Sequence, residues 1–169
     1  MIVDLDSKDR QILKALMEDG RLSNQDLADR VNLSPSPCLR RVRLLEERGI
    51  ITGYGAIVDQ RAVGLPVTAF VGIKLLRHDH GAVAAFEAMV LAREEIVDCH
   101  MMAGEVDYLL RVVAADLADY ERFVREVLHN TPGVGSIETA FAYGRIKQGR
   151  GLPIPGPDRL DRADPAQAV

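Results

Sequence analysis

Arginine and serine side chains recur near residue 40 in a pattern that suits an anionic polymer. If residues 34–45 are helical, at about 100° per residue, then Ser36, Arg40 and Arg43 line one side and Glu47 follows them. These twelve positions hold three arginines and no acid. Arginine bonds bidentately to guanine or phosphate, and a serine near a helix N-terminus can contact phosphate. The stripe therefore predicts contact with double-stranded DNA, although a solvated amphipathic helix would show the same pattern.

The other side of the same stretch is apolar and predicts contact with a hydrophobic core. Its members recur at helical spacing: Cys38, Leu39, Val42 and Leu45. Arg41 flanks the cationic side. We interpret Cys38 as a small buried hydrophobe rather than a redox group. Cys99 is the only other cysteine, and two thiols cannot build a disulfide framework, which predicts a reducing, cytoplasmic setting.

Length and composition are typical of a globular protein with one ordinary domain or two small ones. The chain has 169 residues, of which 47% are hydrophobic and 27% charged. No apolar run approaches the ~20 residues of a membrane helix, and the charged residues near the N-terminus argue against a signal peptide. We therefore expect a cytoplasmic protein with no membrane partner. The net charge of −4 excludes a uniformly basic nucleic-acid binder but not a locally basic one.

Capping residues predict three helices within the first 49 residues. The expected starts are Asp6 with Asp9, Ser23 with Asp26 and Ser34 with Pro35, and the expected stops are Gly20, Asn32 and Gly49. Two short helices joined by a tight turn form a helix-turn-helix. Residues 1–52 are therefore predicted to be a three-helix (winged) helix-turn-helix domain that binds DNA.

Alternating and helical periods predict six further elements over residues 66–148. The expected strands cover residues 67–77, 96–103, 107–114 and 134–147, and the expected helices cover residues 81–93 and the stretch after Asp116. This βαββαβ order is ferredoxin-like, so the fold class is α+β. Such a sheet has helices on one face only. Because no element remains to cover its apolar second face, we expect a twofold dimer.

Two segments fall outside these domains. Residues 50–59 are predicted to be an extended strand. This strand overlaps the predicted linker strand, which covers residues 53–65. Residues 149–169 hold half of all the prolines and little periodicity, which predicts a mobile tail. Leu152 and Ile154 are its candidate anchors.

Seven short motifs follow one another along residues 5–148. They are Leu5-Asp6 with Asp9-Arg10-Gln11-Ile12-Leu13, Asp19-Gly20-Arg21-Leu22-Ser23, Leu33-Ser34-Pro35-Ser36-Pro37, Arg41-Val42-Arg43 with Leu45-Glu46, Gly49-Ile50-Ile51-Thr52-Gly53-Tyr54, Gly104-Glu105-Val106-Asp107-Tyr108 and Thr131-Pro132-Gly133-Val134. Each is weak alone, but in this order and spacing the chain resembles the Lrp/AsnC (feast/famine) family of transcriptional regulators.

The resemblance implies a regulator that binds double-stranded DNA through the helix-turn-helix and a small effector, usually an amino acid, through the ferredoxin-like domain. It also implies homodimers that assemble further, often into octamers. Carried onto this chain, the DNA-contacting residues are Ser23, Asn24, Ser34, Ser36, Pro37, Arg40, Arg41 and Arg43. The implied effector site combines the loop residues Met102, Ala103, Gly104, Glu105, Val106, Asp107 and Tyr108 with Thr139, Ala140 and Phe141 of a neighbouring subunit.

The chemistry of the loop agrees with this implication. Gly104 lets the backbone turn sharply and leaves N–H groups free for a carboxylate, while Asp107 offers an anion to an α-ammonium group. A zwitterion needs both. By itself the stretch also fits an ordinary hairpin turn with a surface acid. Met102 and Val106 favour an apolar amino acid such as leucine, although methionine near a turn is also common core filler.

Two other functions compete with this hypothesis. A metal-dependent enzyme could use His78, His80, Cys99 and His100, but adjacent strand residues such as Cys99 and His100 point to opposite faces. No nucleophile motif, phosphate-binding glycine loop or zinc-protease motif occurs, so we expect no enzyme, no cofactor and no metal. An architectural, nucleoid-type DNA-wrapping protein without an effector would share every DNA-binding feature.

Overall fold

Hydrophobic side chains collect in two separate cores, and the chain divides accordingly. This structure is a computed structural model, which describes residues 5–149 and 151–155. Described residues up to Ala56, together with those from Lys147 onward, form one compact unit, and Ile57–Ile146 form the other. We name them the helical unit and the sheet unit.

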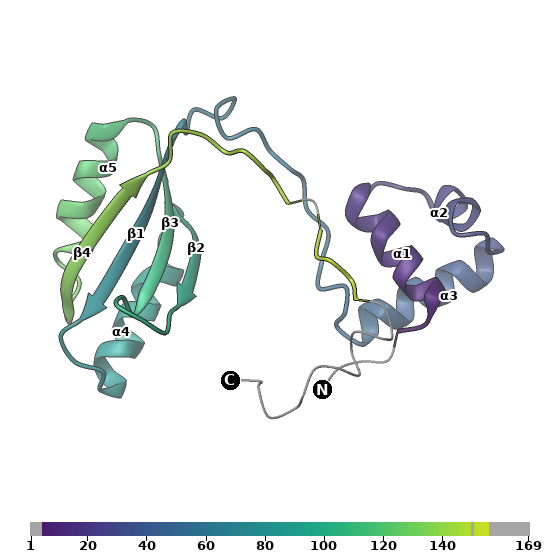
Figure 1. The fold of residues 1–169 in the computed structure, drawn as a ribbon, viewed down its shortest axis with the longest axis horizontal. Helices are drawn as coiled ribbons and strands as arrows, with labels where there is room; N and C mark the ends of the chain where they lie inside the picture. Colours follow the sequence, from purple (N-terminus) through teal and green to yellow (C-terminus); the bar gives the residue numbers. More distant parts are fainter. Residues whose placement is uncertain (1–4, 150, 156–169) are drawn as a thin grey trace. The chain divides into compact units, whose positions relative to one another are not determined.

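Three helices make up the helical unit (Figure 1): α1 (Ser7–Glu18), α2 (Asn24–Arg30) and α3 (Pro35–Glu47). Apolar residues three and four apart turn one side of each helix inward. The buried side chains are Ile12, Leu13, Ala15, Leu27, Ala28, Val31, Cys38 and Leu45. The expected helix-turn-helix is confirmed. The described residues of this unit contain no strand, so the expected wing is absent from them.

The predicted helix starts are confirmed. Asp6 accepts the backbone N–H of Asp9 at 2.8 Å, and the Asp9 carboxylate accepts the N–H of Asp6, which completes a capping box. Ser23 accepts the N–H of Asp26 at 3.1 Å. Ser34 occupies the third N-cap, where its side chain makes no capping bond and a proline opens the helix.

Two of the three predicted stops are confirmed. Asn32 has a φ of 53° in the turn between α2 and α3, and Gly49 has a φ of 68° after α3. The expected left-handed stop at Gly20 is wrong. Helix α1 ends at Glu18, and Asp19 closes it in the extended region with a φ of −145°, so the chain has already turned away before the glycine.

The sheet unit contains β1 (Val67–Leu75), α4 (His80–Leu91), β2 (Ile96–Met101), β3 (Tyr108–Ala114), α5 (Leu117–Phe123) and β4 (Val134–Phe141). A π-helical turn, η1 (Val124–Leu128), continues α5. The strands lie in the order β2-β3-β1-β4, and every neighbouring pair is antiparallel. The predicted ferredoxin-like order is therefore confirmed.

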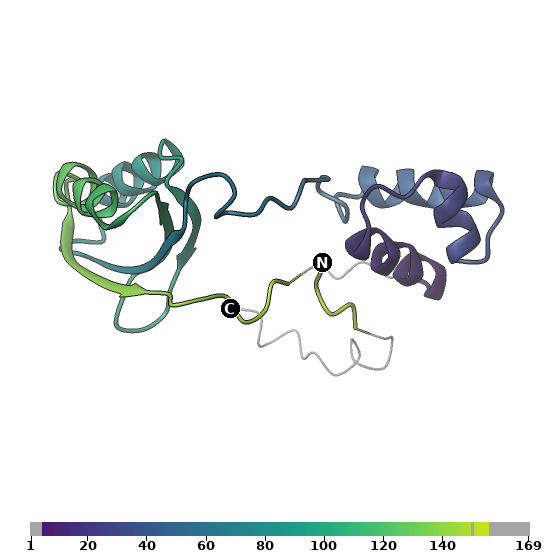
Figure 2. The same cartoon turned by 90° about the horizontal axis from the view of Figure 1, so that it is seen from above.

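Both helices pack on the same face of this sheet, as Figure 2 shows. Alternate residues of β1 and β3 turn toward them, because successive strand side chains point to opposite faces. Phe86 of α4 lies 4.6 Å, ring centre to ring centre, from Tyr108 of β3. Tyr120 and Phe123 of α5 complete the buried layer.

One predicted strand is absent and the other four are longer than those observed: the first ends at Leu75 rather than Arg77, and the third begins at Tyr108 rather than Asp107. Residues 50–66 form no strand, because no neighbouring strand pairs with them in the described part of the chain. The last strand ends at Phe141 rather than Lys147, since its partner β1 begins only at Val67, opposite the end of β4. The second strand ends at Met101 rather than Ala103.

The segment after β4 returns to the helical unit. Ile154 packs against its core, and the Arg10 guanidinium of α1 donates to the carbonyl of Pro155 at 3.0 Å. Ile154 is thus an anchor, as predicted, whereas Leu152 is 80% exposed and is not. The rest of the predicted tail, residues 156–169, lies outside the described residues. No helix in the described ranges is long and apolar enough to cross a membrane.

The core of the sheet unit predicts a local loss of stability. Leu110 of β3 is fully buried, so Leu110→Ala leaves a cavity and lowers the free energy of unfolding of the sheet unit by about 2–5 kcal/mol. Leu117→Ala, at a side chain that is 62% exposed, changes it by less than about 0.5 kcal/mol. Urea titration with hydrogen exchange measures both, and equal losses would contradict the packing described.

Candidate nucleic-acid interface and effector site

The outer side of α3 carries the predicted cationic stripe. Ser36, Pro37, Arg40 and Arg43 are all exposed, and neither arginine has an ion-pair partner among the described residues. We predict that Leu39 faces the core, but it is 37% exposed. Cys38 and Leu45 occupy the buried positions of α3 instead. The stripe therefore leaves two guanidinium groups available to an anion.

Arg41 differs from its two neighbours. Its guanidinium donates to Asp6 at 2.6 Å and to Asp9 at 2.8 Å, both at the start of α1. Hydrogen bonds from the guanidinium to Asp9 and Asp6 raise the pKa of Arg41. The Asp9 N–H and the same guanidinium lower the pKa of Asp6. Arg41 thus fixes α3 to α1 and is set apart from the exposed stripe.

Backbone acceptors at the turn hold α2 and α3 together. The Asn24 side-chain amide donates to the carbonyl of Pro35 at 3.0 Å, which joins the first turns of the two helices. Lys8 of α1 donates to the carbonyl oxygens of Val31 and Asn32 in the turn. Asn24 and the N-cap Ser23 therefore stand beside the start of α3, and Ser23 is already bonded to Asp26.

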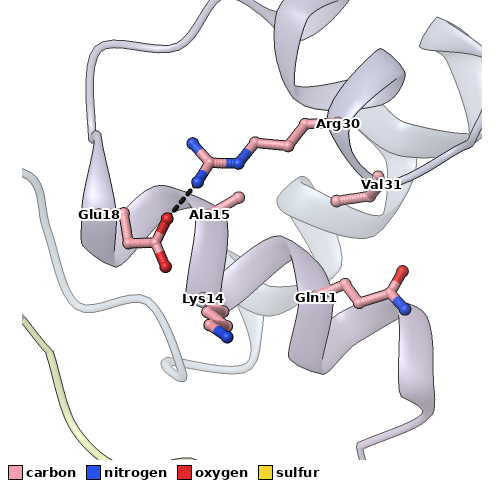
Figure 3. Close-up of a pocket in the computed structure, with 6 residues that line it drawn as sticks. All are labelled: Gln11, Lys14, Ala15, Glu18, Arg30 and Val31. Carbon is pink, nitrogen blue, oxygen red and sulfur yellow. Dashed lines mark hydrogen bonds and ion pairs between the residues drawn. The ribbon is translucent and has the colours of Figure 1, made fainter.

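A small hollow of about 220 Å³ separates α1 from α2 (Figure 3). Arg30 of α2 and Glu18 of α1 form an ion pair across it, with Gln11 and Lys14 along its rim. Both charged side chains are nearly half exposed, so the pair contributes little stability. The hollow is a feature of helix packing on a side of the unit that α3 does not line.

The predicted effector loop is a hairpin turn between β2 and β3. Met102, Ala103 and Glu105 are exposed, and Gly104 has a φ of +152°, which only glycine adopts readily. Val106 folds back over the sheet, so that a Cβ built on Gly72 of β1 would lie 2.9 Å from its Cγ1. The missing side chain at Gly72 therefore lets the loop lie close to β1.

Asp107 ties the loop to the end of β1. Its backbone N–H donates to the carbonyl of Ile73 at 2.8 Å, and its Oδ2 accepts the N–H of Leu75 at 2.7 Å. Its Oδ1 lies 3.0 Å from Nε2 of His78. The Leu75 N–H, followed by His78, lowers the pKa of Asp107, so the carboxylate is an anion over the physiological range.

Tyr108 is buried beneath the loop and cannot itself contact a ligand from solvent. Its hydroxyl donates to Glu87 of α4 at 3.0 Å. Burial, followed by this carboxylate, raises the pKa of Tyr108 to about 12. Tyr108 therefore supports the loop from the core side.

The other predicted half of the effector site lies elsewhere in the same chain. Asp107 binds Leu75, whereas Thr139 of β4 pairs with Val71, four residues or roughly 13 Å back along β1. Thr139 bonds to the Tyr120 hydroxyl at 2.6 Å. Phe141 packs edge-on against the ring of Tyr120. Thr139 and Phe141 both line an open hollow of about 550 Å³ beside α5.

Ala140 points to the face of the sheet away from α4 and α5, where it is paired with Phe70 of β1. Phe70 is 41% exposed there, although it is a large hydrophobic residue. Leu109 of β3 lies on the same face, beside an ion pair between Arg111 and Asp98 at 2.6 Å. This open face carries no helix in the described chain, as Figure 2 shows, and it combines an apolar centre with a charged side.

Sequence reasoning missed the residues that act over long range. Leu75, Gly72 and Glu87 contribute a backbone donor, an absent side chain and a half-buried acceptor, none of which has a local sequence signal. His78 is one of the residues that the alternative hypothesis of a metal-dependent enzyme would use as a ligand. The described residues hold no cluster of three or more His, Cys, Asp or Glu side chains suited to a metal. Cys99 packs against the core while His100 is exposed.

Two family descriptions match the chain along most of its length. Residues 5–52 match a winged helix-turn-helix DNA-binding family, and residues 68–152 match the Lrp/AsnC ligand-binding domain. These ranges cover α1–α3 and all the strands of the sheet unit. The cationic stripe and the hairpin loop therefore fall in separate matched regions.

Individual relatives agree with this result. The leucine-responsive regulatory protein of Salmonella typhimurium is 41% identical over 151 residues, covering 89% of this chain and 92% of its own. A solved transcriptional regulator of Neisseria meningitidis in complex with L-Met has a TM-score of 0.86 and 38% identity, and covers 89% of this chain and 97% of its own. An AsnC family transcriptional regulator of Agrobacterium tumefaciens has a TM-score of 0.84 and 38% identity, with coverage of 88% and 97%. The chain belongs to the Lrp/AsnC family of transcriptional regulators.

Proposed function

We propose that this regulator binds duplex DNA through α3 and senses an apolar amino acid at the hairpin loop. The observation that carries the proposal is the placement of Asp107, whose carboxylate is held at the end of β1 beside a turn in which the backbone N–H groups of residues 103–106 have no hydrogen-bond partner among the described residues. An α-ammonium group pairs with a carboxylate, and an α-carboxylate pairs with backbone donors. A neutral amino acid carries both groups.

DNA binding is supported by what holds α3 in place. Arg41 and Asn24 use their polar groups inside the unit, so the helix is fixed before any ligand arrives. Arg40 and Arg43 are exposed on its outer side, one turn apart, and have no ion-pair partner within the described part of the chain. A helix of this kind fits the major groove, where arginine reads guanine or clamps phosphate. Ser34 and Ser36 at its exposed N-terminus suit a phosphate contact.

The side chain of the effector is proposed from the lining of the loop. Met102 and Val106 supply apolar surface next to the turn. Methionine adapts its shape to branched and unbranched ligands, which favours leucine or methionine over a charged amino acid. A structural neighbour named as an L-Met complex supports this choice.

Assembly is proposed from the open face of the sheet. Phe70, Leu109 and Ala140 form an apolar centre that a second copy of the same face would bury. We propose that this contact forms a dimer and that further contacts build a larger assembly such as an octamer. The loop and Thr139 of one chain are apart, so a complete effector site would draw them from two subunits of the assembly.

Replacing either free arginine tests the DNA interface. Arg40→Ala and Arg43→Ala are each expected to weaken DNA binding roughly 5- to 100-fold, because each removes one guanidinium contact. Fluorescence anisotropy with a duplex selected from a random pool measures the change. Arg93→Ala, at an exposed arginine of the sheet unit, serves as the control and keeps full affinity. Unchanged affinity in both α3 variants would refute the assignment.

An isosteric change tests the effector site. Asp107→Asn keeps an oxygen that accepts the Leu75 N–H but removes the negative charge, so calorimetry should detect at least a tenfold loss of affinity for L-leucine and L-methionine. DNA binding should persist. Glu105→Gln changes an exposed acid in the same turn and should have little effect. If the unmodified protein binds neither amino acid, an effector-free DNA-wrapping role becomes the better interpretation.

A charge on the open face tests assembly. Phe70→Glu buries a carboxylate in the proposed contact and is expected to shift the protein toward monomers in light scattering. Leu117→Glu, on an exposed residue of α5, leaves the dimer intact. A monomeric unmodified protein at micromolar concentration would contradict the proposal.

A further inference from the structure

The carboxylate proposed to bind the effector already has an occupant on each oxygen. Oδ2 of Asp107 is held by the backbone N–H of Leu75, a partner that belongs to the sheet and cannot leave without breaking it. Oδ1 is 3.0 Å from Nε2 of His78, in the segment between β1 and α4. The position that an α-ammonium group would take is therefore filled by an imidazole.

Asp107 and His78 differ in how firmly the structure holds them. The Asp107 side chain is 23% exposed and its backbone is bonded to Ile73, whereas the His78 side chain is 64% exposed. Among the described residues, His78 makes no other side-chain hydrogen bond or ion pair. The imidazole can therefore turn out to solvent while the carboxylate stays in place.

We propose that His78 is a resident competitor for the ammonium subsite: its imidazole occupies Oδ1 of Asp107 in the empty protein, and the amino acid must displace it to bind. The inference rests on the proposed function, because it needs Asp107 to be the ammonium contact. Histidine changes charge between about pH 5 and 8, and its cation pairs with a carboxylate more strongly than the neutral ring does. Effector affinity is therefore lower at pH 6 than at pH 8.

Few other charges contribute to this competition. Besides the pair itself, the titratable and charged groups on the elements that meet at the loop are Lys74, Arg77, Asp79, His80, Glu87, Asp98, Cys99, His100, Glu105, Tyr108, Arg111 and Glu138. Arg77 and Asp79 pair with each other at 3.5 Å, and Glu87 accepts from Tyr108. Lys74 acts on Asp107 through space and lowers its pKa. Among the described residues, His78 is thus the only histidine in direct contact with Asp107.

Calorimetry on the full chain tests the proposal, with L-leucine and L-methionine at pH 6 and pH 8 and at constant ionic strength. Because the displaced pair is exposed, His78→Ala should bind the amino acid roughly two- to fivefold more tightly than the unmodified protein at pH 6, and the difference should shrink at pH 8. His80→Ala, two residues away at the start of α4, is the matched control and should behave like the unmodified protein.

Proton release gives a second readout that a merely structural role would not produce. A histidine that leaves a carboxylate holds its proton less tightly, so displacement should release a fraction of a proton between pH 6 and 8, and the apparent binding enthalpy should depend on the ionisation heat of the buffer. That dependence should be present in the unmodified protein and in His80→Ala, and reduced in His78→Ala.

The outcomes separate this inference from the proposed function. Equal pH dependence in the unmodified protein and His78→Ala, or weaker binding by His78→Ala at both pH values, overturns the competitor role and leaves the effector site standing. If His80→Ala also tightened binding at pH 6, the effect would belong to the segment between β1 and α4 rather than to the His78 imidazole. That result would also overturn the competitor role. Absence of binding to every variant at both pH values overturns the effector site and this inference together.

Discussion

The double pairing of β1 is the constraint on which the sheet unit depends. It lies between β3 and β4 and is antiparallel to both, so its backbone donors and acceptors are used on two edges. One face of this central strand is buried under α4 and α5. Its end also supplies the Leu75 N–H that holds Asp107. Core stability and the position of the loop are therefore properties of the same strand.

The helical unit reaches a fixed geometry in a different way. Its core is small, and polar bonds supplement it: Arg41 joins α3 to α1, and Asn24 joins α2 to α3. Each of these bonds has a partner in the first turn or N-cap of a helix, where unpaired backbone groups and charges are available. Each bond is individually weak, but together they hold α3 with its outer side exposed.

Features encoded by neighbouring residues could be predicted from the sequence, while features that depend on distant partners could not. The capping box of Asp6 and the left-handed Asn32 follow from local chemistry, and both were predicted. Arg41 looks like a third member of the arginine stripe until the two acids of α1, more than thirty residues earlier, are placed beside it. The occupancy of Asp107 by His78 likewise joins residues 29 positions apart, and no periodicity or motif connects them.

The path of the chain after β4 has an energetic consequence. The backbone leaves the helical unit after Ala56 and comes back to it beyond Lys147, where Ile154 and Pro155 dock on α1 and its core. Two segments of backbone thus connect the sheet unit to the helical unit. Closing a loop of this length costs conformational entropy that a single connection would not, and the contacts of Ile154 and Pro155 with the helical unit offset that cost.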